Sequence, residues 1–213
     1  MSPFFKILIA ASLALPVTGI ASASQPAQNQ DEPLDQPQIE NPIIAPENND
    51  VIDTGDNIDR LFEKLRRDIK PKSASATARM IWREWSYSGS KSIDLLMSWA
   101  ARAMRTNNNA KALDLLDQVV TLAPEYAEGW NRRATLYYTM SNYSSSLSDI
   151  ERTLALEPRH FGALSGLAAI LQRFNKPDEA LETWYKVLEI YPANENAQKA
   201  VINLEEKLSG SPT

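Results

Sequence analysis

The sequence predicts an all-α protein built from consecutive pairs of antiparallel helices. Three observations carry this prediction: a pattern that recurs every 34 residues, apolar residues at helical spacing within each unit, and a proline near the end of each unit. The pattern Trp130-x-x-Arg133-Ala134 has counterparts of the same spacing that begin at Leu164 and at Leu96. A fixed period of this length is typical of repeats that stack into a solenoid with one continuous core.

Each unit carries an apolar stripe on both of its predicted helices. Residues three, four and seven apart share one face of a helix, as Leu96, Trp99 and Ala103 do here. Small residues are expected where paired helices approach most closely, because a larger side chain would push the helices apart. These small residues form three pairs: Ala100 with Ala112, Ala134 with Ser146, and Ala168 with Ala180.

The prolines set the unit boundaries. Because proline lacks an amide hydrogen and clashes with the preceding turn, Pro124, Pro158 and Pro192 are each expected to end a second helix. The predicted repeat domain covers 59–208, followed by a short tail over 209–213. Its clear units are 93–126, 127–160 and 161–194, and a helix over 195–208 caps the end of the stack.

The segment 59–92 keeps the apolar spacing of a repeat unit, but two other positions of the repeat pattern are occupied by residues that do not fit it. Arg66 stands in place of the small residue, and Ser90 stands in place of the proline. We interpret this segment as a degenerate repeat that caps the N-terminal end of the stack, with an unrelated helix pair as the alternative.

Residues 1–23 have the pattern of a secretory signal peptide. Lys6 precedes a mostly apolar run over 7–15, and Ala21-Ser22-Ala23 forms a cleavage site. The alternative is an uncleaved anchor, but the apolar run is short and interrupted. We therefore expect a periplasmic or exported chain that starts at Ser24 and has no stable membrane insertion after cleavage.

Charge is unevenly placed in the following region. The stretch 24–56 has eight acidic and no basic residues, so 24–58 is predicted to be a disordered, acidic, proline-rich tail. Residues 57–105 carry eleven basic and five acidic side chains, a net charge of +6. A solvated helix face explains this excess. The alternative is that the tail docks on the first repeats through Ile43-Ile44 and Val51-Ile52.

The chain offers no residue set for catalysis, a cofactor or a metal. It has one histidine, His160, and no cysteine, so disulfides and thiolate metal sites are excluded and His160 is expected to be structural. No phosphate-binding loop or nucleophile motif is present. Nucleic acid is a weak candidate partner because the aromatic residues fall on repeat core positions and the charge excess is modest. The tryptophans at these core positions are Trp82, Trp85, Trp99, Trp130 and Trp184.

The 34-residue pattern resembles the tetratricopeptide repeat (TPR). The stretches 128–135 and 159–164 are similar to short exported TPR proteins of Gram-negative bacteria. The resemblance implies a short right-handed solenoid of three clear repeats and one degenerate one, closed by the capping helix. It also implies that the first helices line a concave groove for another protein or an extended peptide.

By repeat position, the resemblance places fifteen residues in this groove. They are Asp94, Met97, Ala101, Met104, Arg105, Glu128, Asn131, Arg132, Thr135, Tyr138, Thr139, Ser165, Ala169, Gln172 and Arg173. TPR proteins that clamp the acidic C-termini of chaperones use a lysine and an asparagine where this chain has Met97 and Ala101, so that role is disfavoured.

The resemblance implies no defined activity beyond protein binding. Together with the expected export, it leads us to expect a non-enzymatic adaptor or scaffold of the cell envelope. Two alternatives stay open: a regulatory or targeting subunit of a cell-wall enzyme, and a carrier of a peptide or small ligand in the groove.

Overall fold

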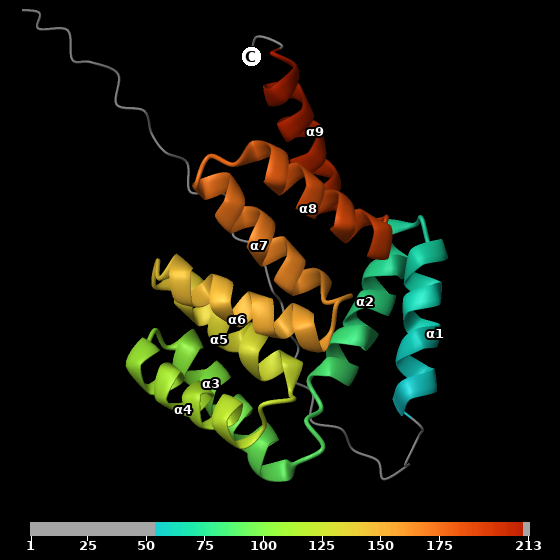
Figure 1. Cartoon of the computed structure of the whole chain (residues 1–213). Helices are drawn as coiled ribbons and strands as arrows, with labels where there is room; N and C mark the ends of the chain where they lie inside the picture. Colours follow the sequence, from blue (N-terminus) through green and yellow to red (C-terminus); the bar gives the residue numbers. More distant parts are fainter. Residues whose placement is uncertain (1–53, 211–213) are drawn as a thin grey trace, which may run out of the picture. The chain divides into compact units, whose positions relative to one another are not determined.

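The computed structural model describes residues 54–210, and all secondary structure in this range is α-helical (Figure 1). The expected signal peptide over 1–23, most of the predicted acidic tail and residues 211–213 lie outside the described residues. No helix between residues 54 and 210 combines the length and the hydropathy that a bilayer crossing requires. The helices are α1 Thr54–Arg67, α2 Pro71–Trp85, α3 Lys91–Arg105, α4 Asn109–Leu122, α5 Ala127–Thr139, α6 Tyr143–Leu156, α7 Phe161–Arg173, α8 Pro177–Ile190 and α9 Glu195–Ser209.

The three predicted repeats are the helix pairs α3–α4, α5–α6 and α7–α8. The small residues expected between paired helices are all buried, which confirms their packing role. In the second repeat the Ser146 hydroxyl also donates a hydrogen bond to the Ala134 carbonyl oxygen at 2.8 Å. This bond satisfies the buried hydroxyl, so a serine fits where the other repeats have alanine.

The turns inside the repeats are equivalent as well. Asn107, Ser141 and Asn175 have φ values of 54°, 58° and 54°, which places all three in the left-handed region. Asparagine tolerates this conformation better than most residues. The next residue in the first two turns, Asn108 and Asn142, caps the following helix by accepting a hydrogen bond from a backbone amide.

The helix pair expected within 59–92 forms, but it does not stack on α3 as an additional repeat. Helix α1 begins at Thr54 and not after residue 58. The buried residues of α1 and α2, such as Phe62, Ile81 and Trp85, belong to one apolar cluster with residues of α7, α8 and α9. The N-terminal hairpin, residues 54–85, therefore buries its apolar face mainly against α7, α8 and α9 and not against the outer face of α3. This corrects its expected role as the N-terminal cap.

Helix α2 runs beside the two junctions between consecutive repeats and toward the junction between the last repeat and α9 (Figure 1). At the first junction, the Tyr126 hydroxyl donates to the carbonyl oxygen of Ser86, just after α2, at 3.0 Å. At the second, the Trp85 ring stacks on His160 with a centroid separation of 4.1 Å. At the third, Tyr191 belongs to the same apolar cluster. The hairpin thus contacts both junctions between repeats, and it shares an apolar cluster with the junction between the last repeat and α9.

Two further contacts at the second junction fix the hairpin. The Arg159 guanidinium lies 2.6 Å from the Asp59 carboxylate and 4.2 Å from the centre of the Phe62 ring. Trp82 lies over Gly162, where an added Cβ would be only 2.5 Å from the indole. Glycine at 162 therefore allows α2 to approach α7 this closely.

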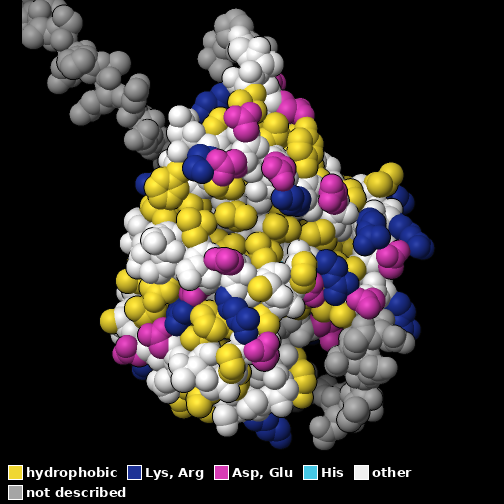
Figure 2. All heavy atoms as spheres, viewed as in Figure 1, with side chains coloured by type: hydrophobic (Ala, Val, Ile, Leu, Met, Phe, Trp, Pro, Cys, Tyr) yellow, Lys and Arg dark blue, Asp and Glu magenta, His cyan; other side chains and the backbone are white. Residues whose placement is uncertain are grey.

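The basic side chains of α1 are largely solvated, as the simpler interpretation of the charge excess predicts. Figure 2 shows Lys and Arg side chains interspersed with Asp and Glu over this part of the surface. Glu63 accepts from Arg66 at 3.2 Å and from Arg67 at 3.1 Å, and all three are exposed. Such exposed pairs contribute little to stability.

The tryptophans divide into different environments, so the prediction that all five lie in the core is wrong for one of them. Trp85 and Trp184 are buried, and Trp82 and Trp130 are half-buried. Trp99 is 47% exposed, because the face of α3 that would receive a preceding repeat has no helix pair on it.

Candidate functional site

The candidate site is the first-helix row, the fifteen residues predicted to line the inner face of α3, α5 and α7. Three of the fifteen residues are buried and therefore cannot contact a partner: Ala101, Glu128 and Asn131. Arg105, Thr139 and Arg173 are exposed. The other nine members are half-buried: Asp94, Met97, Met104, Arg132, Thr135, Tyr138, Ser165, Ala169 and Gln172.

Glu128 and its neighbours form a buried polar cluster at the N-terminal end of α5. The Glu128 carboxylate accepts from the Asn131 amide at 2.8 Å and from the Arg132 guanidinium at 2.6 Å. His160 Nε2 lies 3.4 Å from the same carboxylate, and His160 Nδ1 accepts from the backbone amide of Ala163 at 3.1 Å. Since Nδ1 is an acceptor, Nε2 is the nitrogen that carries the proton toward Glu128.

The electrostatics of this cluster favour an ionised glutamate. Burial, the strongest influence, raises the pKa of Glu128, but the Arg132 charge and the hydrogen bonds from His160 and Asn131 together outweigh it. The pKa of Glu128 is therefore lowered overall. The Trp85 ring covers His160, so the hairpin seals the cluster from solvent. His160 caps α7 and supports the junction, the structural role expected of it.

Several polar residues of the row are engaged within the protein. The Thr135 and Ser165 hydroxyls donate to backbone carbonyl oxygens one turn earlier in their own helices. Asp94 accepts from the backbone amide of Ser88. Gln172 accepts from the Trp184 indole at 3.1 Å. These side chains support the fold, and Gln172 does so in the last turn of α7, directly before Arg173.

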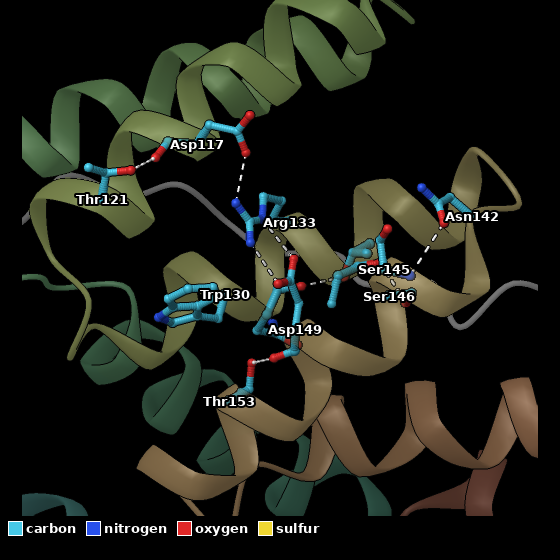
Figure 3. A network of polar contacts seen from close by, with 12 residues as sticks. Asp117, Thr121, Trp130, Arg133, Asn142, Ser145, Ser146, Asp149 and Thr153 are labelled. Atoms are coloured by element: carbon cyan, nitrogen blue, oxygen red, sulfur yellow. Dashed lines mark hydrogen bonds and ion pairs between the residues drawn. The ribbon is translucent and has the colours of Figure 1, made fainter.

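Arg133 links two repeats on the other side of α5, as Figure 3 shows. Its guanidinium binds the Asp149 carboxylate of α6 through two hydrogen bonds of 2.8 Å and Asp117 of α4 through a third of 2.8 Å. The hydrogen bond to Asp149, followed by that to Asp117, raises the pKa of Arg133 despite burial. The guanidinium also lies 5.0 Å from the centre of the Trp130 ring. This network couples neighbouring repeats.

The end of the row nearest the intra-repeat turns is aromatic and partly exposed. Tyr138 of α5 packs edge-on against Tyr143 at 5.6 Å, and Tyr143 packs edge-on against Phe174 at 5.7 Å. The Arg173 guanidinium lies 5.2 Å from the Tyr143 ring. Phe174 is 55% exposed. We call Tyr138, Tyr143, Arg173 and Phe174 the aromatic end of the row.

The residues predicted from repeat position include Tyr138 and Arg173 of this end but not Tyr143 and Phe174. Both missed residues flank a turn with a left-handed residue, at Ser141 or Asn175. An aromatic side chain next to such a turn could have indicated an accessible position. In the described part of the chain, no group of three or more histidine, aspartate or glutamate residues is placed to hold a metal ion.

Comparisons with known proteins agree with this architecture. A tetratricopeptide repeat profile matches residues 131–195. A TPR repeat-containing protein of Rhizobium etli is 43% identical over 208 residues, which cover 98% of both chains. Sperm-associated antigen 1 of Mus musculus is 34% identical over 85 residues, which are 40% of this chain and 9% of that protein.

Two solved structures resemble the fold. The first TPR of Spaghetti bound to an HSP90 peptide has a TM-score of 0.53 and 20% identity, over 55% of this chain and 96% of that one. The MamA protein has a TM-score of 0.51 and 16% identity, over 73% of this chain and 83% of that one. At these identities the likeness concerns the fold alone. The near full-length similarity to the Rhizobium protein, together with the repeats, shows that the chain belongs to the tetratricopeptide repeat family.

Proposed function

We propose that this protein is a non-enzymatic adaptor of the cell envelope that binds a partner protein or an extended peptide at the aromatic end of the first-helix row. The observation that carries the proposal is the cluster of Tyr138, Tyr143, Arg173 and Phe174, in which Arg173 and Phe174 are exposed beside two half-buried tyrosine rings. Tyrosine and arginine are enriched among the residues that dominate binding energy at protein interfaces.

The chemistry of this end indicates the kind of segment that it fits. Phe174 and the tyrosine rings offer apolar contact, while Arg173 and Arg105 are exposed cations at equivalent positions of α7 and α3. A partner segment with an apolar side chain near a carboxylate would match both features. The Spaghetti TPR was solved with a bound HSP90 peptide, which supports a peptide as the type of ligand. The envelope location rests on the signal peptide expected over residues 1–23.

A capture experiment from crosslinked envelope tests this proposal. The test variant is Arg173→Ala with Phe174→Ala, which removes an exposed cation and an exposed ring. The matched control is Tyr185→Ala with Lys186→Ala, because α8 also presents an aromatic residue next to a cation at exposed positions. Unchanged thermal unfolding of both variants confirms that each is folded.

The proposal predicts that proteins captured by the wild type are retained by the control and lost by the test variant. With the captured partner purified, the affinity should fall about tenfold or more, the effect of truncating residues that dominate an interface. Equal capture by both variants would contradict the assignment of the aromatic end. Capture only of cytoplasmic proteins would contradict the envelope role.

A further inference from the structure

A second surface, on the outer face of α3, lacks the neighbour that the repeat fold normally supplies. Leu95 and Trp99 are each 47% exposed there. Their counterparts 34 residues later are Gly129 and Arg133. Both counterparts face the preceding repeat: a Cβ on Gly129 would lie 2.8 Å from Val119 of α4, and Arg133 binds Asp117 of α4. The same face of α3 is open because the N-terminal hairpin packs elsewhere.

The open face is apolar with a basic border. Lys91 lies one turn before Leu95, and Arg102 lies one turn after Trp99. Both are exposed, and neither forms an ion pair with a carboxylate among the described residues. Asp94, the acidic residue of this helix, is held by Ser88. An occupant of this face should therefore be apolar and acidic.

The residues immediately before α1 have this composition. The stretch 37–53 has four acidic residues, no lysine or arginine, and five aliphatic residues. Its acidic residues are Glu40, Glu47, Asp50 and Asp53, and its aliphatic residues are Ile39, Ile43, Ile44, Val51 and Ile52.

The chain also emerges at the appropriate place. The Asn57 side chain, near the start of α1, donates to Glu84 in the last turn of α2 at 3.3 Å. Figure 1 shows that α1 starts at the end of the hairpin from which the chain continues into α3. The ten residues from Ile44 to Thr54 can span about 33 Å, whereas the fifteen residues of α3 are about 22 Å long.

We propose that residues 37–53 dock on the outer face of α3, with their aliphatic side chains on Leu95 and Trp99 and their carboxylates near Lys91 and Arg102. The segment would cover the face that a preceding repeat covers elsewhere. Because the contact is intramolecular, a short link to α1 raises the effective concentration and permits occupancy with only a few contacts. This surface is distinct from the aromatic end, so its test does not depend on the proposed function.

Paramagnetic relaxation in the full chain tests this proposal. The sequence has no cysteine, so Ala45→Cys provides a single attachment site for a nitroxide. The nitroxide should weaken the amide signals of residues 95–102 about twofold or more relative to the reduced label, while signals around Tyr185, an exposed aromatic on α8, keep their intensity.

Two variants of the labelled chain separate the proposed contacts from chance proximity. Replacing Glu40, Glu47, Asp50 and Asp53 with glutamine or asparagine should restore most of the lost α3 signal. Trp99→Ala should do the same, because it removes the ring on which the segment docks. Equal α3 intensities with active and reduced label would overturn the proposal. So would an effect seen only when spin-labelled and isotope-labelled copies are mixed, because the occupant would then be a second copy of the chain.

Discussion

Trp85 and Trp99 provide a direct comparison, because the sequence predicts both as core residues and the structure separates them. Trp85 is 8% exposed and contacts His160, Phe62 and Phe161, whereas Trp99 is 47% exposed. We predict that Trp85→Ala lowers the free energy of unfolding much more than Trp99→Ala, although both remove the same atoms.

The magnitude follows from the area that each ring buries. A buried tryptophan removes about 150–250 Å² from water, and at about 25 cal/mol per Å² this corresponds to roughly 4–6 kcal/mol. Measured losses for truncating large aromatic core residues are about 3–5 kcal/mol, and we expect Trp85→Ala in that range. For Trp99 the loss should be about 1.5–2.5 kcal/mol, because the described helices bury only about half of the residue.

Chemical denaturation monitored by far-ultraviolet circular dichroism measures both losses. Hydrogen exchange on the Trp85 variant should also show faster exchange in α1 and α2 than in α5 and α6, because the hairpin loses the stacking of Trp85 on His160 at the second junction. Equal losses for the two variants would refute the placement of the hairpin. A larger loss for Trp99→Ala would indicate that α3 is covered by a stacked helix pair.

Three further predictions concern the junctions between repeats. Gly162→Val should destabilise the protein by about 1–3 kcal/mol through overpacking against Trp82, and the additional variant Trp82→Ala should relieve part of the loss in a double-mutant cycle. Arg133→Met keeps the length of the side chain but leaves the Asp149 carboxylate buried without its partner, so it should cost about 3–5 kcal/mol in denaturation measurements. The pKa of Glu128 in the folded state lies below its ordinary value of 4.5, so the unfolded state binds a proton at Glu128 more readily than the folded state does. The stability that ionised Glu128 contributes is therefore present above pH 4.5 and is lost as the pH falls through the folded-state pKa. Glu128→Gln should flatten this acidic part of the stability profile, and an unchanged profile would contradict the assignment.

The repeat helices could be predicted from the sequence because their determinants are local and periodic. Pro124 and its counterparts end helices through backbone chemistry, and Ala100 and its counterparts mark the close contact between paired helices. Each of these signals recurs at the same spacing, so three units support one interpretation.

The position of the hairpin could not be predicted in this way. The apolar stripe of α2 shows that one face is buried, but periodicity does not identify the surface that buries it. The decisive contacts join residues far apart in sequence, such as Asp59 with Arg159 and Trp82 with Gly162. In retrospect Gly162 is the strongest local signal, because a glycine at the start of α7 permits the close approach of Trp82.

The first-helix row could be proposed from the sequence because its members recur at fixed repeat positions, and its role in binding stays a prediction. Repeat position identified the first-helix row, including Tyr138 and Arg173. It could not show that Glu128 and Asn131 would be buried, because the residues that seal them, His160 and Trp85, belong to another repeat and to the hairpin. The distribution of accessible residues along the row therefore depends on where the hairpin packs.

Site-specific photocrosslinking tests the placement of the N-terminal hairpin most directly. A benzophenone amino acid in place of Trp82 has a similar size and would face the start of α7. After irradiation and proteolysis, the structure predicts intramolecular crosslinks to residues 159–163, identified by mass spectrometry. Crosslinks to α3, the neighbour that a stacked fourth repeat would have, would contradict the placement of the hairpin across the repeat junctions.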